Sequence, residues 1–286
     1  MIKVQECHQE NVYIKQEKTR HKKIGHAGTL DPIATGLLPL LINKATRVSD
    51  FLMDEVKIYE TLAFFGQKTD TQDITGEILE KSSKTFEKKD LEKAIKENFL
   101  GEILQTPPMY SALKQNGKKL YELAREGKIV ERKQRRITVY DFESLDFDFP
   151  YARFKITCSK GTYIRSLVND LGEVLKTFAT VKELRRLKVG NFDVKDAIII
   201  EDFENNYVEE LIKKLIPIDD ALNQYEKIIL DKSYYKQATN GMTMKIDLGK
   251  NFDGLIRVYV EDLFIGLGEY KNKNKTLKLK KVFYEG

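Results

Sequence analysis

The spacing of apolar residues predicts alternating strands and helices along the first two thirds of the chain. Segment 56–65 alternates as a strand, with Ile58, Leu62 and Phe64 on one face and Tyr59, Thr61 and Ala63 on the other. Segment 85–99 has Leu91, Ile95 and Phe99 spaced by four residues and Gly101 just beyond. This pattern is typical of an amphipathic helix that ends before a glycine.

The next segments continue the alternation. Residues 152–158 carry apolar side chains at every second position, as expected of one face of a strand, namely Ala152, Phe154, Ile156 and Cys158. After Gly161 the period changes to that of a helix whose buried stripe is Ile164, Leu167, Val168 and Leu171. Arg165 lies next to this stripe and is expected to point away from it. A further helix is predicted at 207–215, ended by Pro217.

The last part of the chain has a different pattern. Segments 254–260, 263–268 and 276–282 are short strand-like runs separated by turn residues such as Gly and Asn. Several short strands in succession indicate a small β domain, which we expect to be a barrel.

Composition is that of a globular protein with one large and one small domain. The chain has 286 residues, 41% hydrophobic and 33% charged, and no apolar run approaches the ~20 residues of a membrane span. Its polar N-terminus does not look like a signal peptide. Cys7 and Cys158 form no paired motif, and three scattered histidines give no metal-ligand spacing. We therefore expect a cytoplasmic protein without a structural metal.

Positive charge is concentrated in two places, although the net charge is only +5. Residues 109–136 contain nine Lys and Arg against three Glu, and the last sixteen residues contain six Lys against Glu285. A lysine-rich run is commonly just solvated surface, but two such runs also suit contact with phosphates. The acidic, aromatic stretch 140–151 between them is expected to pack on protein.

The most informative segment is 25–36, Gly-His-Ala-Gly-Thr-Leu-Asp-Pro-Ile-Ala-Thr-Gly. Its glycines and proline exclude a regular helix and indicate a tight loop, while the apolar run that follows indicates a buried strand. Pro32 biases Asp31 toward an extended conformation. A loop held by a rigid scaffold commonly carries catalysis, although an Asp-Pro pair can equally be a simple turn.

This loop resembles the active-site loop of the TruB family, the bacterial tRNA pseudouridine-55 synthases. The resemblance continues in order along the chain, strongly from 22 to about 190 and weakly beyond. It is carried by Lys57–Glu60, Gly66–Asp73, Pro107–Lys114, Gly117–Tyr121, Cys158–Arg165 and Leu184–Leu187.

The resemblance implies an α+β fold, the pseudouridine synthase fold, with a mixed, largely antiparallel sheet flanked by helices. It implies a catalytic domain at 1–220 and, from position, strand pattern and lysine content, a PUA-like RNA-binding β domain at 221–286. The implied activity is isomerisation of uridine to pseudouridine at position 55, in the T-loop of tRNA. The partner is then the T-arm of tRNA, with no cofactor, no membrane and no obligate protein partner, and the protein is expected to be a monomer.

By the same resemblance, Asp31 is the catalytic carboxylate, Arg165 its guanidinium partner and Tyr59 an aromatic residue against the flipped uracil. Flipping a base out of its stack costs a few kcal/mol, and an aromatic face replaces the lost stacking. A carboxylate can act at a ribose as nucleophile or base, and the sequence leaves attack on C1′ and proton abstraction from C2′ both open. A nearby guanidinium favours the ionised carboxylate that either route needs.

The remaining site residues are also implied by the resemblance. Tyr163 and Leu184 are expected to line the uracil pocket, and His26 to fill the gap that the flipped base leaves in the RNA. Contacts to the RNA backbone are expected from Lys114, Lys118, Lys119, Arg185 and Arg186.

The first 24 residues depart from the family, whose members begin with an apolar strand and a Lys-Pro-x-Gly segment. Here this stretch contains no Pro, no Gly and no comparable apolar strand, so we expect a sheet edge or an apolar surface to be left uncovered. The departure keeps a second interpretation open, a non-catalytic tRNA-binding or tRNA-folding protein that retains the synthase fold. A synthase acting on another RNA is a third. A nucleotide-cofactor enzyme is disfavoured because neither a Walker loop nor a GxGxxG fingerprint occurs.

Overall fold

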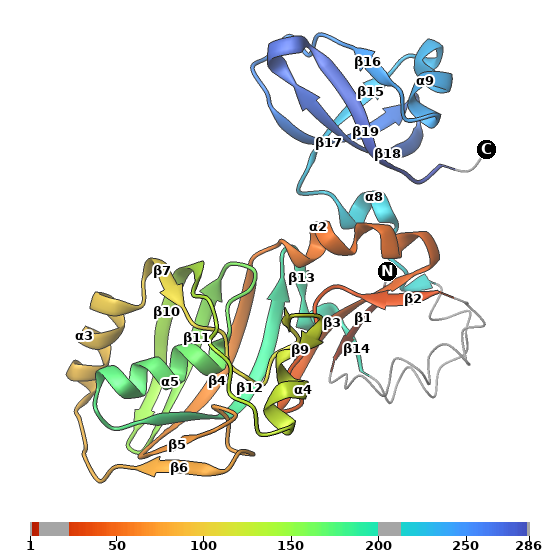
Figure 1. The fold of residues 1–286 in the computed structure, drawn as a ribbon. Helices are drawn as coiled ribbons and strands as arrows, with labels where there is room; N and C mark the ends of the chain where they lie inside the picture. Colours follow the sequence, from red (N-terminus) through yellow and green to blue (C-terminus); the bar gives the residue numbers. More distant parts are fainter. Residues whose placement is uncertain (1, 6–22, 200–212, 285–286) are drawn as a thin grey trace.

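A computed structural model describes residues 2–5, 23–199 and 213–284. A ten-stranded sheet forms the larger part of the molecule (Figure 1). Its main order is β14 (Ile198–Ile199), β1 (Ile2–Gln5), β3 (Ala34–Ile42), β12 (Ala179–Val189), β4 (Lys57–Phe65), β11 (Tyr151–Cys158), β10 (Arg135–Asp148) and β7 (Gly101–Gln105), with β2 (Ile24–His26) beside β3 and β13 (Phe192–Asp193) beside β12. The β3–β12 and β1–β14 pairs are parallel and the other pairs antiparallel. The predicted mixed, largely antiparallel sheet is confirmed.

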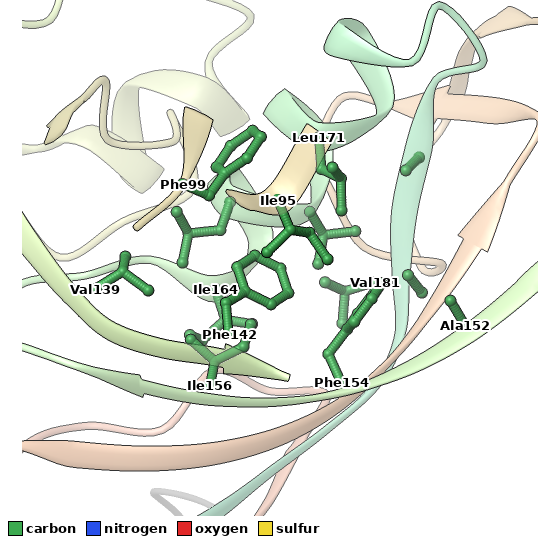
Figure 2. Packing of buried hydrophobic residues seen from close by; sticks show 14 of the residues in the cluster. Ile95, Phe99, Val139, Phe142, Ala152, Phe154, Ile156, Ile164, Leu171 and Val181 are labelled. Atoms are coloured by element: carbon green, nitrogen blue, oxygen red, sulfur yellow. The ribbon is translucent and has the colours of Figure 1, made fainter. Parts of the chain in front are cut away.

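The strand and helix predictions around the main core are confirmed. Ala152, Phe154, Ile156 and Cys158 are all buried on one face of β11. Helix α3 (Lys88–Asn98) begins where the Asp90 carboxylate accepts the backbone N–H of Glu87, at 3.0 Å. Figure 2 shows side chains from α3, α5 (Ile164–Val174) and the strands packed together. The rings of Phe142 and Phe154 pack edge to face, with their centroids 5.1 Å apart. These two helices cover one face of the sheet.

Helix α5 is buried more completely than its apolar stripe predicts. Ile164, Leu167, Val168 and Leu171 face the core as expected, but Arg165, Ser166 and Asn169 are buried as well. Residue Arg165 therefore points away from the stripe without reaching solvent. It points into a polar interior, which is the active-site region described below.

Several short helices and two hairpins connect or flank the strands of this sheet. They are η1 (Asn43–Val48), α2 (Ser49–Met53), the hairpin β5 (Gln67–Thr69)–β6 (Ile78–Lys81), the hairpin β8 (Lys114–Gln115)–β9 (Lys118–Lys119), α4 (Leu120–Arg125) and η2 (Val194–Asp196). The acidic stretch 140–151 forms the end of β10, a turn and the start of β11, so it pairs with protein as predicted.

The C-terminal part is a five-stranded sheet of order β15 (Glu226–Leu230), β17 (Gly254–Val260), β18 (Leu263–Lys271), β19 (Thr276–Val282) and β16 (Thr243–Lys245). The β15–β17 pair is parallel and the others are antiparallel. The three strands predicted here are confirmed. A separate cluster of buried apolar side chains lies against this sheet. The short helices of this part are η3 (Lys232–Tyr234), α9 (Tyr235–Thr239) and η4 (Asn272–Asn274).

The C-terminal sheet packs on the ten-stranded sheet. One buried cluster contains Leu37 and Leu41 of β3 together with Leu267 and Phe283. Arg47 Nη1 donates to the Val282 carbonyl at 2.7 Å, which adds a polar contact between the parts. Helix α8 (Ile218–Ala221) lies where the domain boundary was predicted, and its Ala221 belongs to the same cluster. The C-terminal sheet is thereby attached to the strand that follows the 25–36 loop.

The expectation of an uncovered edge at the N-terminus is wrong. Residues Ile2–Gln5 form β1, antiparallel to β3 from Ile2↔Leu40 to Gln5↔Leu37 and parallel to β14. Only two of the four residues of β1, Ile2 and Val4, are apolar, which is too short a pattern to predict a strand. The strand forms because β3 and β14 pair with it by backbone hydrogen bonds. The helix predicted at 207–215 lies almost entirely outside the described residues. Within the described residues, no helix is long and apolar enough to cross a membrane.

Candidate active site

The 25–36 loop is a turn between two paired strands. Strand β2 runs antiparallel to β3, with His26 opposite Leu40, and Ala27 N donates to the Pro39 carbonyl at 3.0 Å. The turn itself is closed by Ala34 N, which donates to the Asp31 carbonyl at 2.9 Å. At Gly36, with φ of 99°, an added Cβ would lie 2.3 Å from the Arg186 carbonyl oxygen, so only glycine fits there. Asp31 is therefore held at the tip of a turn anchored to the central sheet.

Asp31 and Arg165 form a two-pronged ion pair. Arg165 Nε lies 2.8 Å from Asp31 Oδ2, and Nη2 lies 2.8 Å from Asp31 Oδ1. The Arg165 side chain is 3% exposed, whereas that of Asp31 is 30% exposed. Such bidentate, charge-assisted bonds fix the orientation of a carboxylate. Asp31 thus keeps an open side from which a substrate can approach.

The rest of the Arg165 guanidinium is also satisfied. Its Nη1 donates to the Thr71 carbonyl at 2.8 Å and lies 3.5 Å from Asp73 Oδ2, and its Nη2 donates to the Tyr110 carbonyl at 2.9 Å. Asp73 is buried and accepts hydrogen bonds from Thr71 and Thr75. Asp73 and Tyr110 were missed as site residues, although both lie in motifs that carry the resemblance. The contact of the Asp73 carboxylate with the Arg165 guanidinium joins residues far apart in the chain, so the sequence gives no sign of it.

Tyr59 lies beside this pair on β4. It packs with Leu30 against the main core cluster, which includes Leu184, and Leu184 is opposite Ala34 and Thr61 in the sheet register. Burial raises the pKa of the Tyr59 phenol, and the positive charge of Arg186 opposes that rise. The phenol is therefore protonated at neutral pH. The structure brings Asp31, Tyr59, Arg165 and Leu184 into one region, as the sequence predicted.

Tyr163 precedes α5 and is held by a buried amide. Gln105 Nε2 donates to the Tyr163 carbonyl at 3.0 Å, and Tyr163 N donates to Gln105 Oε1 at 2.9 Å. Gln105 is 2% exposed. Burial raises the pKa of the Tyr163 phenol. These two hydrogen bonds between the Gln105 side chain and the Tyr163 backbone fix the position at which α5, the helix that carries Arg165, begins.

His26 lies at the end of β2, next to the loop. Burial lowers the pKa of its imidazole, and the charge of Arg186 lowers it further. Its Nδ1 is buried and makes no hydrogen bond to the described part of the chain. His26 is thus a neutral imidazole with a free ring nitrogen at neutral pH.

The predicted phosphate contact of Arg186 is not supported by its burial. Arg186 is 2% exposed, because its position opposite Tyr59 in the register turns it toward the interior of the catalytic region. Arg185 is opposite Glu60, on the other face of the strand. There it lines a depression of about 350 Å³ together with Ile33 and Thr35 of the 25–36 loop, Leu184, and the charged residues Glu60, Arg153, Lys182 and Glu183. Arg185 therefore borders an open depression beside the loop, whereas Arg186 is buried, so the two arginines do not share one surface.

Lys114, Lys118 and Lys119 lie on the β8–β9 hairpin. Lys114 and Lys118 are exposed and Lys119 is half-buried. Lys118 pairs with Glu126 at 3.4 Å, and Lys119 Nζ donates to the Tyr121 hydroxyl at 3.2 Å. The hairpin begins at Lys114, four residues after Tyr110, whose carbonyl accepts a hydrogen bond from Arg165.

A second basic surface lies on the C-terminal sheet. A shallow depression of about 430 Å³ is lined by Lys271, Lys278 and Lys280 with Thr243, Glu269, Asn274 and Thr276. Lys280 pairs with Glu269 at 3.0 Å. Among the residues that the structure describes, no group of His, Cys, Asp and Glu side chains is arranged to hold a metal ion.

Comparison with known proteins links this geometry to one family. A model described as "TruB family pseudouridylate synthase (N terminal domain)" matches residues 16–164, and one described as "tRNA pseudouridylate synthase B C-terminal domain" matches residues 165–223. A curated relative from Clostridium kluyveri, "tRNA pseudouridine synthase B", is 43% identical over 268 residues, 92% of this chain and 91% of the relative. A relative of the same name from Clostridium tetani is 44% identical and covers 94% of this chain and 93% of its own length.

Solved structures share the fold. "Crystal Structure of a Cbf5-Nop10-Gar1 Complex" superposes with a TM-score of 0.75 at 24% identity, covering 99% of this chain and 84% of that chain. "Structure of H/ACA RNP bound to a substrate RNA containing 2'-deoxyuridine" gives a TM-score of 0.74 at 22% identity, with coverage of 99% and 84%. At this level of identity, the likeness supports the fold alone.

Proposed function

The chain belongs to the TruB family of pseudouridylate synthases, and from that premise we propose that it converts uridine to pseudouridine at position 55, in the T-loop of tRNA. The observation that carries the proposal is the pairing of Asp31 with Arg165. A half-open carboxylate is held by a buried guanidinium, 2.8 Å away through both of its oxygens. This arrangement fixes the orientation of the carboxylate, as attack at a ribose requires.

The reaction is an isomerisation in which atoms balance without a cofactor. The bond between N1 of uracil and C1′ of ribose breaks and a bond between C5 and C1′ forms. The hydrogen on C5 leaves as a proton, and N1 takes up a proton in its place. Asp31 acts at the ribose, and its open side serves attack on C1′ and proton abstraction from C2′ equally well. Tyr59 lies beside it, with a protonated phenol that can stack on the uracil or relay a proton.

The other residues of the region bind the flipped nucleotide and the RNA loop. Tyr163 and Leu184 shape the uracil pocket. His26, neutral and with a free ring nitrogen, occupies the space that the base leaves in the T-loop, since stacking on histidine is a common RNA contact.

Basic surfaces hold the rest of the T-arm. Lys114, Lys118 and Lys119 contact its phosphates beside the active site, and the C-terminal part, 221–286, acts as a PUA-like RNA-binding domain through its lysine-lined depression. The protein acts in the cytoplasm as a monomer, without a cofactor.

Release of tritium from tRNA labelled at C5 of uridine tests this function, because forming the C5–C1′ bond expels that hydrogen. We expect release from a tRNA transcript and none from a transcript with cytidine at position 55. Asp31→Asn should abolish release while tRNA affinity stays within a few-fold, because phosphate contacts dominate affinity. The matched control is Asp141→Asn, an exposed carboxylate on β10, which should behave as wild type.

Two results would contradict the proposal. Near-normal turnover by Asp31→Asn would exclude Asp31 as the reacting group. A wild-type protein that binds tRNA but never releases tritium would instead favour the non-catalytic binding protein.

A further inference from the structure

Arg186 is the largest side chain that is almost fully buried. It lies on β12 at the centre of the sheet, opposite Gly36 of β3 and Tyr59 of β4. A guanidinium loses strong hydration when it is buried, so its presence in an interior requires compensating hydrogen bonds. The partners of Arg186 therefore indicate what the residue is for.

Its hydrogen bonds reach both ends of the 25–36 loop. Arg186 Nη2 donates to the Gly28 carbonyl at 3.0 Å, and Nε donates to the Leu37 carbonyl at 2.8 Å. Gly28 precedes Asp31 in the sequence and Leu37 follows it. Backbone contact adds to this, because the glycine at position 36 lets β3 approach the Arg186 backbone closely. One planar group thus joins the loop backbone at Gly28, three residues before Asp31, to strand β3 at Leu37, six residues after it.

The same guanidinium acts on Tyr59. The two residues are directly opposite each other in the β12–β4 register, and the positive charge of Arg186 lowers the pKa of the phenol against the larger effect of burial, which raises it. Its charge also reaches His26 and Lys57: burial is the main cause of the lowered pKa of each, and Arg186 is the second. For Lys57 the pKa falls to about 8. Arg186 is therefore the common neighbour of the loop and of the aromatic residue beside Asp31.

We propose that Arg186 is a positioning residue, which fixes the distance and orientation between the Asp31 turn and Tyr59. This inference rests on the proposed function, in which Asp31 and Tyr59 act on one nucleotide from two different strands. The planar fork of arginine offers several donors in fixed directions, whereas lysine offers a single charged nitrogen on a flexible chain. Arg186→Lys keeps the charge and removes the fork, so it tests the geometry directly.

The experiment compares wild type, Arg186→Lys and Arg186→Met with a matched control, Arg153→Met. Arg153 pairs with Glu60 and Glu183 on the opposite face of the same sheet. For each variant we measure the single-turnover rate, the Kd for tRNA with its salt dependence, and the melting temperature. Amide hydrogen exchange of peptides covering 27–36 is measured without substrate, so it reports on the loop even if no turnover is found.

We expect Arg186→Lys to lower the single-turnover rate by about one to two orders of magnitude, because a small misplacement of reacting groups has an effect of that size. Its Kd and salt slope should match wild type, and peptides 27–36 should exchange faster. In the Tyr59→Phe background the effect of Arg186→Lys should shrink, because one of the groups that Arg186 orients is gone. Arg153→Met should leave all of these properties near wild type.

Three results would overturn the inference. Unchanged exchange of peptides 27–36 in both Arg186 variants would show that the loop is held by other contacts, whatever the outcome for turnover. A rate that falls only as far as the folded fraction falls would make Arg186 a structural residue. A weaker Kd with a shallower salt slope would restore the phosphate contact that the sequence predicted.

Discussion

Replacing Arg165 with methionine tests whether one buried guanidinium supports both the fold and the active site. The substitution keeps most of the side-chain volume and removes the charge. It strands two carboxylates, Asp31 and Asp73, and leaves the carbonyls of Thr71 and Tyr110 without their donor. We expect stability and activity to fall together.

The size of the effect follows from burial. Removing one member of a well-buried ion pair costs about 3–5 kcal/mol. Here the side chain of Asp31 is 30% exposed and can be rehydrated, and Asp73 keeps its hydrogen bonds from Thr71 and Thr75. The lower end, about 3 kcal/mol, is therefore expected, which in a protein of this size lowers the melting temperature by about 6–12 °C.

Activity should fall further than stability alone explains. Without Arg165 the Asp31 carboxylate loses both of its fixed bonds, and loss of orientation lowers a rate by about a hundredfold. The assay is tritium release under single-turnover conditions, with calorimetry for the melting temperature and Arg153→Met as the control. The Arg153 side chain is 36% exposed, so that control should cost less than about 1 kcal/mol.

An unchanged melting temperature with unchanged activity would refute this reasoning, because it would mean that the guanidinium is dispensable to both carboxylates. A second variant, Arg165→Lys, tests the same reasoning if the methionine variant does not fold. It retains the charge, so a rate close to wild type in Arg165→Lys would show that charge alone, rather than the two-pronged geometry, supports Asp31.

Three other predictions concern RNA binding, histidine titration and the start of α5. The double variant Lys271→Gln with Lys278→Gln should weaken tRNA binding and flatten its salt dependence, measured between about 50 and 200 mM salt. Its single-turnover rate at saturating tRNA should be unchanged. A salt slope equal to that of wild type would exclude an RNA contact at these lysines. The lowered pKa of His26 means that the unfolded state binds more protons between the folded-state pKa and 6.5. The unfolding free energy of wild type, relative to His26→Ala, should therefore fall as pH drops through that window; a difference independent of pH would contradict the burial of the imidazole. Gln105→Glu replaces the donor to the Tyr163 carbonyl with an acceptor, so turnover and melting temperature should both fall, whereas retention of both would show that the amide pair is dispensable.

The sequence by itself predicted most of the strands and helices that surround the main core. Alternation at positions 152–158 and the four-residue spacing in 85–99 predict a strand and a helix because each buries one face, and the structure has β11 and α3 there. Such features are encoded locally, in the period of apolar side chains and in the backbone preferences of glycine and proline. The pairing of Asp31 with Arg165 came instead from the resemblance to the family, and the structure places the two side chains 2.8 Å apart.

Only the tertiary structure decided how the remaining polar residues are used. The adjacent arginines 185 and 186 look alike in the sequence, but the pleat of β12 sends Arg185 to one face and buries Arg186 behind the loop. Asp73 becomes the second carboxylate on Arg165 through a contact across 92 residues of chain, from 73 to 165. Strand β1 exists because β3 and β14 offer it hydrogen bonds. Whether a charged side chain is solvated or buried depends on partners far away in the sequence, and no local pattern records those partners.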